Sequence, residues 1–178
     1  MESESATGGV TIRRAAREDA PVFLELVKAL ADYERLQPPN AEAQARLIED
    51  GFGPQPRFEA YLAEWEGEAV GYAIVCETYS NSSFSAQPTL YLEDLFVHPD
   101  ARRRGAGRAM LRFLASEALA RGCGRMEWMV LDWNELAQGV YRRIGAAIMN
   151  EWRLCRLTGQ ALESFARGEG DHRPSGER

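Results

Sequence analysis

Residues 91–111 read YLEDLFVHPDARRRGAGRAML, and this stretch decides the fold. Its first seven residues have the aromatic and aliphatic content of a buried strand, which the turn-forming residues 98–100 end. From Arg108 onward, apolar residues recur at helical spacing. The pattern predicts a strand that carries carboxylates and is joined, through an arginine-rich glycine turn, to the start of a helix.

The turn has the composition of a phosphate site. Gly105 and Gly107 allow several backbone N–H groups to converge at a helix N-terminus, where the helix dipole is positive. A nucleoside triphosphatase loop would need GxxxxGK[ST], which is absent, and a dinucleotide fingerprint would need a third glycine where Met110 stands. The pattern that remains is [RQ]xxGx[GA], made by Arg102, Gly105 and Gly107. At this point a basic loop before an ordinary helix is the alternative.

A second motif follows the predicted helix. Gly122 and Gly124 break the chain, and residues 125–131 (RMEWMVL) are typical of a buried strand. The next stretch, WNELAQGVYRRIGA, predicts a short helix closed by Gly145. Asn134 and Tyr141 lie seven positions apart, or two helical turns, and should share nearly one face.

The two motifs together resemble the GNAT superfamily of acetyl-CoA-dependent N-acetyltransferases. RRRGAG matches the pyrophosphate loop of that family, and its pattern of Asn, about six residues, Tyr and Gly-Ala is matched by Asn134, Tyr141, Gly145 and Ala146. The segments ALADYERL, IEDGFG, YLEDLFV and EWRLCRLTGQALESFA are similar, more narrowly, to the branch of spermidine/spermine and thialysine N-acetyltransferases. The similarity covers roughly residues 10–166. Val140, where the family often has Phe, and SNSSFSAQPT (80–89), where related chains often carry a glycine-rich, aromatic loop, depart from it.

The resemblance implies an α+β fold with a mixed, mostly antiparallel central sheet, flanking helices and a splayed or bulged central strand. The chain order agrees: a strand at VTIRRA, two helices, a hairpin turning at residues 66–68, and the strand 91–97. Further strands are expected around RMEWMVL and WRLCRL, on either side of the short helix, with a last helix at GQALESFA. We expect one domain over 10–166, a disordered segment 1–9 and a mobile tail 167–178.

The resemblance also implies where acetyl-CoA binds. A distorted central strand frees backbone N–H groups near the thioester and pantetheine, and Leu95, Phe96 and Val97 would supply them here. The rest of the expected cofactor site consists of Arg102, Arg103, Arg104, Gly105, Ala106, Gly107, Arg108, Asn134 and Tyr141.

Amine acetylation assigns roles to the polar residues. A primary amine, with an ordinary pKa near ~10.4, is mostly protonated at neutral pH, and only its neutral form attacks a thioester. We expect Glu93 to accept the proton, through a water, and Tyr141 to protonate or hydrogen-bond the departing thiolate. Neighbours in an ideal strand point to opposite faces, so Glu93 and Asp94 can line one cleft only if the strand bulges or splays.

The expected substrate is a small cationic amine. Asp94 is the expected anchor for its charge, and Tyr33 and Glu34 match family residues that line the amine pocket. A polyamine or diamine, which needs a second acidic site at a distance, comes first. The alternative is a lysine-like amino acid such as thialysine, which needs a cationic group for its carboxylate. A non-catalytic acyl-CoA sensor would keep the glycine loop but lose Glu93 and Tyr141, and both are present.

Composition agrees with a single enzyme domain. The chain has 178 residues, of which 45% are hydrophobic and 27% charged, as in globular proteins. A formal net charge of −6 argues against nucleic acid as a partner. Three widely spaced cysteines and two histidines indicate neither a disulfide framework nor a metal site. The N-terminus does not resemble a signal peptide and no apolar run approaches ~20 residues, so we expect a cytoplasmic protein without membrane contact. The branch also implies a homodimer.

Overall fold

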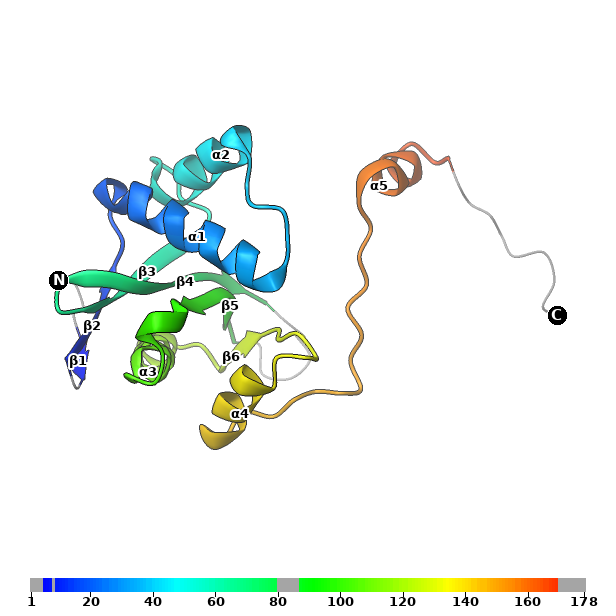
Figure 1. Ribbon diagram of the computed structural model, residues 1–178. Coiled ribbons are helices and arrows are strands. Elements are labelled where there is room, and N and C mark those ends of the chain that lie inside the picture. Colours follow the sequence, from blue (N-terminus) through cyan, green and yellow to red (C-terminus); the bar gives the residue numbers. More distant parts are fainter. Residues whose placement is uncertain (1–4, 8, 80–86, 170–178) are drawn as a thin grey trace. The chain divides into compact units, whose positions relative to one another are not determined.

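The computed structural model describes residues 5–7, 9–79 and 87–169, in two compact units, Met1–Asn134 and Glu135–Arg178 (Figure 1). Most of the expected polar connection, residues 80–86, and the end of the expected tail, residues 170–178, lie outside the described residues. Within the described part of the chain, no helix is long and apolar enough to cross a membrane.

Among the described residues of the first unit, six strands form a central sheet in which they follow the order of the sequence. They are β1 (Ser5–Thr7), β2 (Val10–Arg14), β3 (Glu59–Trp65), β4 (Glu68–Thr78), β5 (Thr89–Val97) and β6 (Arg125–Trp128). All neighbours are antiparallel except β5 and β6, which are parallel. The mixed, mostly antiparallel sheet predicted from the sequence is therefore confirmed.

Helices cover both faces of this sheet (Figure 1). One face carries α1 (Ala20–Glu34) and α2 (Ala41–Phe52), and the other carries α3 (Ala106–Ala120). Two short 3-10 turns, Arg17–Asp19 and Pro99–Ala101, precede α1 and the glycine loop. The expected α+β class is thus confirmed.

Local sequence explains several of these boundaries. Glu66 and Gly67, with φ of 52° and 83°, form a two-residue turn between β3 and β4. Two successive left-handed residues suit the right-handed twist of a hairpin, and glycine adopts that conformation without strain. The side chain of Asn40 accepts a hydrogen bond from the Ala43 N–H at 2.9 Å and so caps α2.

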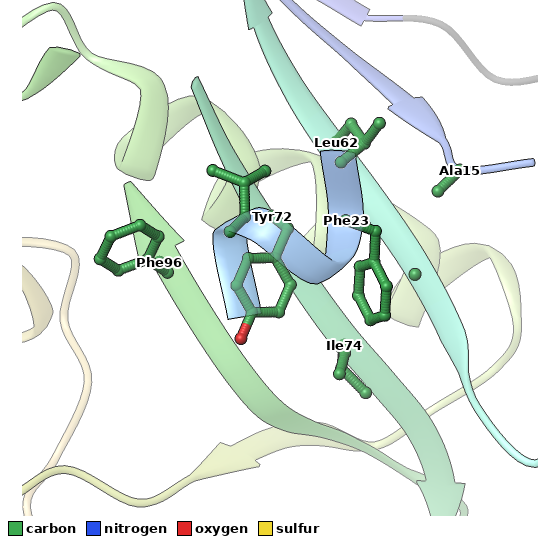
Figure 2. Close-up of a cluster of buried hydrophobic side chains, with 8 residues drawn as sticks. Ala15, Phe23, Leu62, Tyr72, Ile74 and Phe96 are labelled. Carbon is green, nitrogen blue, oxygen red and sulfur yellow. The ribbon is translucent and has the colours of Figure 1, made fainter. Parts of the chain in front are cut away.

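The main hydrophobic core lies between the sheet and α1 (Figure 2). Phe23 of α1 meets Tyr72 of β4 edge to face, with ring centroids 5.4 Å apart. Leu62 lies opposite Tyr72 on β3 and is fully buried. Burial of these side chains fixes the register of the strands, because a one-residue slip would turn them to the other face.

An ion cluster lies on the α3 side of the sheet. Arg121, just after α3, donates to both carboxylate oxygens of Glu59 and, at 2.9 Å, to the hydroxyl of Tyr61. Tyr61 also packs against Phe113 of α3, with centroids 5.2 Å apart. Burial alone would raise the pKa of Glu59, but the hydrogen bonds from Arg121 and Tyr61 lower it. The cluster ties the end of α3 to β3.

Two sequence-based expectations about the chain ends need correction. Residues 5–7, expected in a disordered segment, form β1 and pair with β2. Residues 152–157, expected as a strand, belong to no strand in the part of the chain that the structure describes, and Trp152, Leu154 and Leu157 are exposed. Their apolar content matched a strand, but a strand forms only where another strand offers backbone partners, and that pairing is not local.

The second unit contains α4 (Glu135–Arg143) and α5 (Gly159–Ala166). The helix expected to end at Gly145 does so through a Schellman motif. Gly145, with φ of 89°, donates its N–H to Arg142 at 3.1 Å, and Ala146 donates to Tyr141 at 3.0 Å. The Gly-Ala pair therefore closes the helix that carries Tyr141.

Candidate active site

A β-bulge interrupts β5 at Glu93. On β4, Ile74 lies opposite Asp94 and the next residue, Val75, lies opposite Leu92, so Glu93 has no counterpart in β4. One extra residue in one of two paired strands bends that strand and increases its twist. The distortion expected in this strand is therefore present, and it falls at Glu93, the first of the two predicted carboxylates.

The bulge changes which side chains share a face of the sheet. Tyr91 and Asp94 lie opposite Cys76 and Ile74, which are two residues apart and so point the same way. Without the extra residue, Asp94 would share a face with Leu92 instead. The bulge thus directs Asp94 to the face covered by α1, and it leaves Glu93 exposed.

The carboxyl group of Asp94 has acidic neighbours. Its Oδ2 accepts a hydrogen bond from the Tyr72 hydroxyl at 2.9 Å. Burial raises the pKa of Asp94, the charges of Glu93 and Glu34 raise it further, and the bond from Tyr72 opposes this rise. Among the described residues, no ion pair joins Glu34, Glu93 or Asp94 to a cationic side chain. An ammonium ion would therefore be attracted to this group of carboxylates.

The end of α1 meets the glycine loop beside this acidic group. The guanidinium carbon of Arg102 lies 4.5 Å from the ring centroid of Tyr33, and Arg102 Nε donates to the Val97 carbonyl at 3.1 Å. The Tyr33 ring also packs against Trp133, with centroids 5.9 Å apart. The structure thus brings the predicted residues Tyr33, Glu34, Asp94 and Arg102 into one region.

The loop itself has the geometry expected of an anion site. Arg103 and Gly105 have left-handed φ of 66° and 89°, and Gly105 is the N-cap of α3. The N–H groups of the first turn of a helix have no partner within the helix, and they point outward with the positive end of the dipole. Ala106 is buried and Gly107 half-buried, whereas Arg103, Arg104 and Arg108 are exposed around this end.

In the part of the chain that the structure describes, the end of β5 has a partner strand on one side only. The parallel pairing with β6 extends from Thr89 to Leu92 only, the last pair being Leu92 with Trp128. In the described structure, no strand pairs with residues 93–97 on that side. Backbone groups of Leu95, Phe96 and Val97 that point away from β4 can therefore bind an extended ligand, as expected for pantetheine.

Tyr141 and Asn134 lie at α4. Asn134 immediately precedes the helix, with its N–H bonded to the Leu131 carbonyl at 3.0 Å. Tyr141 is the buried residue of α4, with 9% of its surface exposed, and burial raises the pKa of its phenol. A phenol that holds its proton can act as an acid.

A family model described as the acetyltransferase (GNAT) family matches residues 23–146, which include β5, the glycine loop, α3 and α4 up to its closing Gly-Ala. The chain belongs to this family. It is accordingly an acetyl-CoA-dependent N-acetyltransferase, and the resemblance found in the sequence is confirmed.

Individual relatives agree with the GNAT assignment. The thialysine N-epsilon-acetyltransferase of Bos taurus is 33% identical over 166 residues, which are 88% of this chain and 97% of the relative. The L-ornithine N5-acetyltransferase NATA1 of Arabidopsis thaliana is 39% identical over 110 residues, 62% of this chain and 48% of the relative. A solved integron cassette protein of V. cholerae has a TM-score of 0.76 at 22% identity and covers 89% of this chain and 98% of its own. This last likeness shows the fold alone.

One polar residue of this GNAT site was not identified from the sequence. Tyr72 was included only as part of a hairpin strand, although its hydroxyl contacts Asp94. A signal was available: Tyr72 stands in the continuous apolar run 69–76, which is typical of a strand buried on both faces, and a buried tyrosine hydroxyl usually has a hydrogen-bond partner. The sequence did not show which residue that partner would be.

Proposed function

We propose that this GNAT enzyme transfers the acetyl group of acetyl-CoA to a primary amine of a small substrate that carries a second positive charge, most simply a diamine or polyamine. The observation that carries this proposal is the group formed by Glu34, Glu93 and Asp94. The charges of Glu93 and Glu34 act on Asp94, and none of the three carboxylates has a cationic partner among the described residues. Such a site binds cations and discriminates against neutral or anionic amines.

In the proposed reaction the amine attacks the thioester carbonyl directly. Glu93, exposed in the bulge, accepts the ammonium proton through a water, and the free amine forms the new C–N bond. The C–S bond then breaks, and Tyr141 donates its phenolic proton to the departing thiolate. The acylated nitrogen loses its second proton to the Tyr141 phenolate through water, which leaves the neutral amide and restores the phenol. The backbone edge of residues 95–97 would hold the pantetheine arm, and the glycine loop and the start of α3 would hold the pyrophosphate.

A second candidate is a lysine-like amino acid, acetylated at its side-chain amine. Two curated relatives are named for substrates of this kind, thialysine and ornithine. The stacked guanidinium of Arg102, above Tyr33, is the cation that a substrate carboxylate would need. The two candidates share the acidic group and differ in whether Arg102 contacts substrate.

The branch resemblance also supports a homodimer as the assembly of this enzyme. The mass of the purified protein in solution, by light scattering after size exclusion, tests this proposal.

A panel of amines tests the function. Purified enzyme and acetyl-CoA are incubated with 1,4-diaminobutane, spermidine, butylamine, ornithine and thialysine, and the released thiol is measured. We expect the diamine and spermidine to react with a kcat/KM at least tenfold above that of butylamine. Preference for ornithine or thialysine would favour the second candidate, and release with none of the five would contradict both.

The role of Glu93 has its own test. Glu93→Gln should lower turnover most near neutral pH, and the deficit should shrink as pH rises and free amine accumulates. Glu68→Gln, an exposed carboxyl in the β3–β4 hairpin, is the matched control and should leave turnover unchanged. A deficit that is constant across pH would argue against a base.

A further inference from the structure

Tyr72 occupies an unusual place for a polar side chain. Its ring is fully buried in the α1-side core, edge to face with Phe23 at 5.4 Å and near Phe96 at 6.4 Å. Figure 2 shows its hydroxyl oxygen pointing away from Leu62 and Ala15, at the edge of the cluster. That oxygen donates to Asp94 Oδ2 at 2.9 Å. The core therefore holds a hydrogen-bond donor in a fixed position against the active-site carboxylate.

This donor would be unnecessary if the residue served packing alone. A phenylalanine would fill nearly the same volume without the cost of burying a hydroxyl. A hydrogen bond to a carboxylate is strong, and it fixes one of the two oxygens. The other oxygen, and the remaining lone pair of the first, stay available to a ligand. The bulge at Glu93 is required for this contact because it turns Asp94 to the face of Tyr72.

We propose that Tyr72 is a positioning residue of the amine site: its hydroxyl holds the Asp94 carboxylate in one orientation, so that Asp94 and Glu34 together receive the distal ammonium group of a diamine or polyamine. The inference rests on the proposed function and names the subsite for the second charge. Glu93, which is exposed in the bulge, would then accept the proton of the reacting amine.

The pH dependence of this subsite follows from the groups that face Asp94. They are Tyr72 from β4, Glu34 from α1 and Glu93 from β5. Burial and the two carboxylates raise the pKa of Asp94, and the Tyr72 bond lowers it. Removing the hydroxyl must therefore raise the pKa of Asp94 further. At a given acidic pH, a larger fraction of Asp94 would be protonated and unable to pair with an ammonium ion.

The test compares Tyr72→Phe with Tyr61→Phe in the full-length enzyme. Tyr61 is an equally buried tyrosine of the same sheet, and its hydroxyl also contacts a carboxylate, that of Glu59, but on the α3 side. Two measurements are made with 1,4-diaminobutane and with butylamine, which lacks the second charge. The first is the Kd by calorimetry with CoA present, and the second is kcat/KM between pH 5.5 and pH 9.

We expect Tyr72→Phe to weaken diamine binding about tenfold, the size of one hydrogen bond to a charged group, and to change butylamine binding less than twofold. The acid limb of kcat/KM for the diamine should move to higher pH, while the limb for butylamine stays. Tyr61→Phe should change thermal stability without changing the ratio of the two amines.

Several results would overturn the inference. Equal losses for both amines, or an unshifted acid limb, would reduce Tyr72 to a packing role. A Tyr61→Phe variant with the same selectivity change would show that any loosening of the sheet has this effect. Failure of the wild-type enzyme to bind the diamine more tightly than butylamine would remove the subsite. If the wild type binds the diamine selectively but acetylates neither amine, the proposed function fails and the subsite remains.

Discussion

The guanidinium group of Arg102 lies over the ring of Tyr33, with its carbon 4.5 Å from the ring centroid. Arg102 belongs to the glycine loop and Tyr33 to the end of α1, so this one contact joins the expected cofactor loop to the expected amine pocket. Binding at one of these places can therefore order the other.

Arg102→Ala should consequently weaken CoA binding and also raise the KM for the amine. A cation–π contact of this kind contributes about 0.5–2 kcal/mol, so the amine KM should rise roughly twofold to thirtyfold. Arg104→Ala is the matched control, because Arg104 lies over Trp65 at 5.4 Å instead. It should change the affinity for CoA and leave the amine KM unchanged. An equal rise of the amine KM in both variants would refute the link through Tyr33.

The two glycines of the loop should respond differently to substitution. A Cβ on Gly107 would meet only Val97 Cγ2, at 3.7 Å, which is an ordinary contact. Gly107→Val should therefore fold, while its side chain reduces access to the N–H groups at the start of α3 and weakens CoA binding. Gly105 has φ of 89°, so Gly105→Ala should lose about 1–2 kcal/mol of folding free energy through backbone strain. Calorimetry with CoA and thermal unfolding separate the two effects, and unchanged CoA affinity in Gly107→Val would remove the loop from the cofactor site.

Tyr141→Phe keeps the buried ring and deletes the proton that the thiolate would accept. We expect kcat to fall by ~10²–10⁴ with little change in CoA affinity. Burial raises the pKa of Tyr141 above its ordinary value of 10.0, so the phenol stays protonated at neutral pH. The wild-type enzyme should accordingly show no alkaline loss of kcat from this group below about pH 10. Parallel losses of kcat and CoA affinity in the variant would indicate packing instead.

Asp94→Asn should lower diamine turnover and raise the stability of the protein, and the gain in stability should depend on pH. The folded-state pKa of Asp94 is raised above its ordinary value of 3.8, chiefly by burial. Protonated Asp94 stabilises the folded state at low pH. As pH rises from the pKa of Asp94 in the unfolded chain to its pKa in the folded protein, the unfolded chain loses the proton first, so the free energy of unfolding decreases. The asparagine variant escapes this loss. Its melting temperature relative to wild type should therefore increase between pH 4 and pH 7, while diamine turnover falls.

Glu68→Gln is the control for that comparison, since Glu68 is an exposed carboxyl in the β3–β4 hairpin. Its melting temperature should follow that of wild type at both pH values. If the difference in melting temperature between Asp94→Asn and wild type is the same at pH 4 and pH 7, the charge of Asp94 does not destabilise the folded protein.

Most of the fold could be predicted because its signals are local. The Glu66–Gly67 turn and the closing Gly145 each depend on neighbours within a few residues, and both are confirmed. The strand and helix around the glycine loop follow from periodicity alone. The predicted strand at residues 152–157 was wrong because strand formation depends on a partner elsewhere in the chain.

The site was only partly predictable for a similar reason. Glu93 and Asp94 were identified from the chemistry of carboxylates in a strand, and the family resemblance supplied the distortion between them. The bond between Tyr72 and Asp94 joins residues 22 positions apart, and it depends on the position of the bulge. If the bulge were shifted by one residue, a different side chain would face Tyr72. The amino-acid composition of the strand does not indicate where the bulge lies.

The bulge at Glu93 also bears on how this enzyme can change over evolutionary time. Phe96 is buried in the core and Asp94 is hydrogen-bonded to the buried Tyr72, so a substitution at either changes contacts with the core. Glu93 stands outside that constraint, exposed and without a counterpart in the neighbouring strand. A single codon change there would alter the charge of the proposed reaction site without repacking the core. The extra residue thus places one of the two expected carboxylates where its side chain can change without any change in the packing of the core.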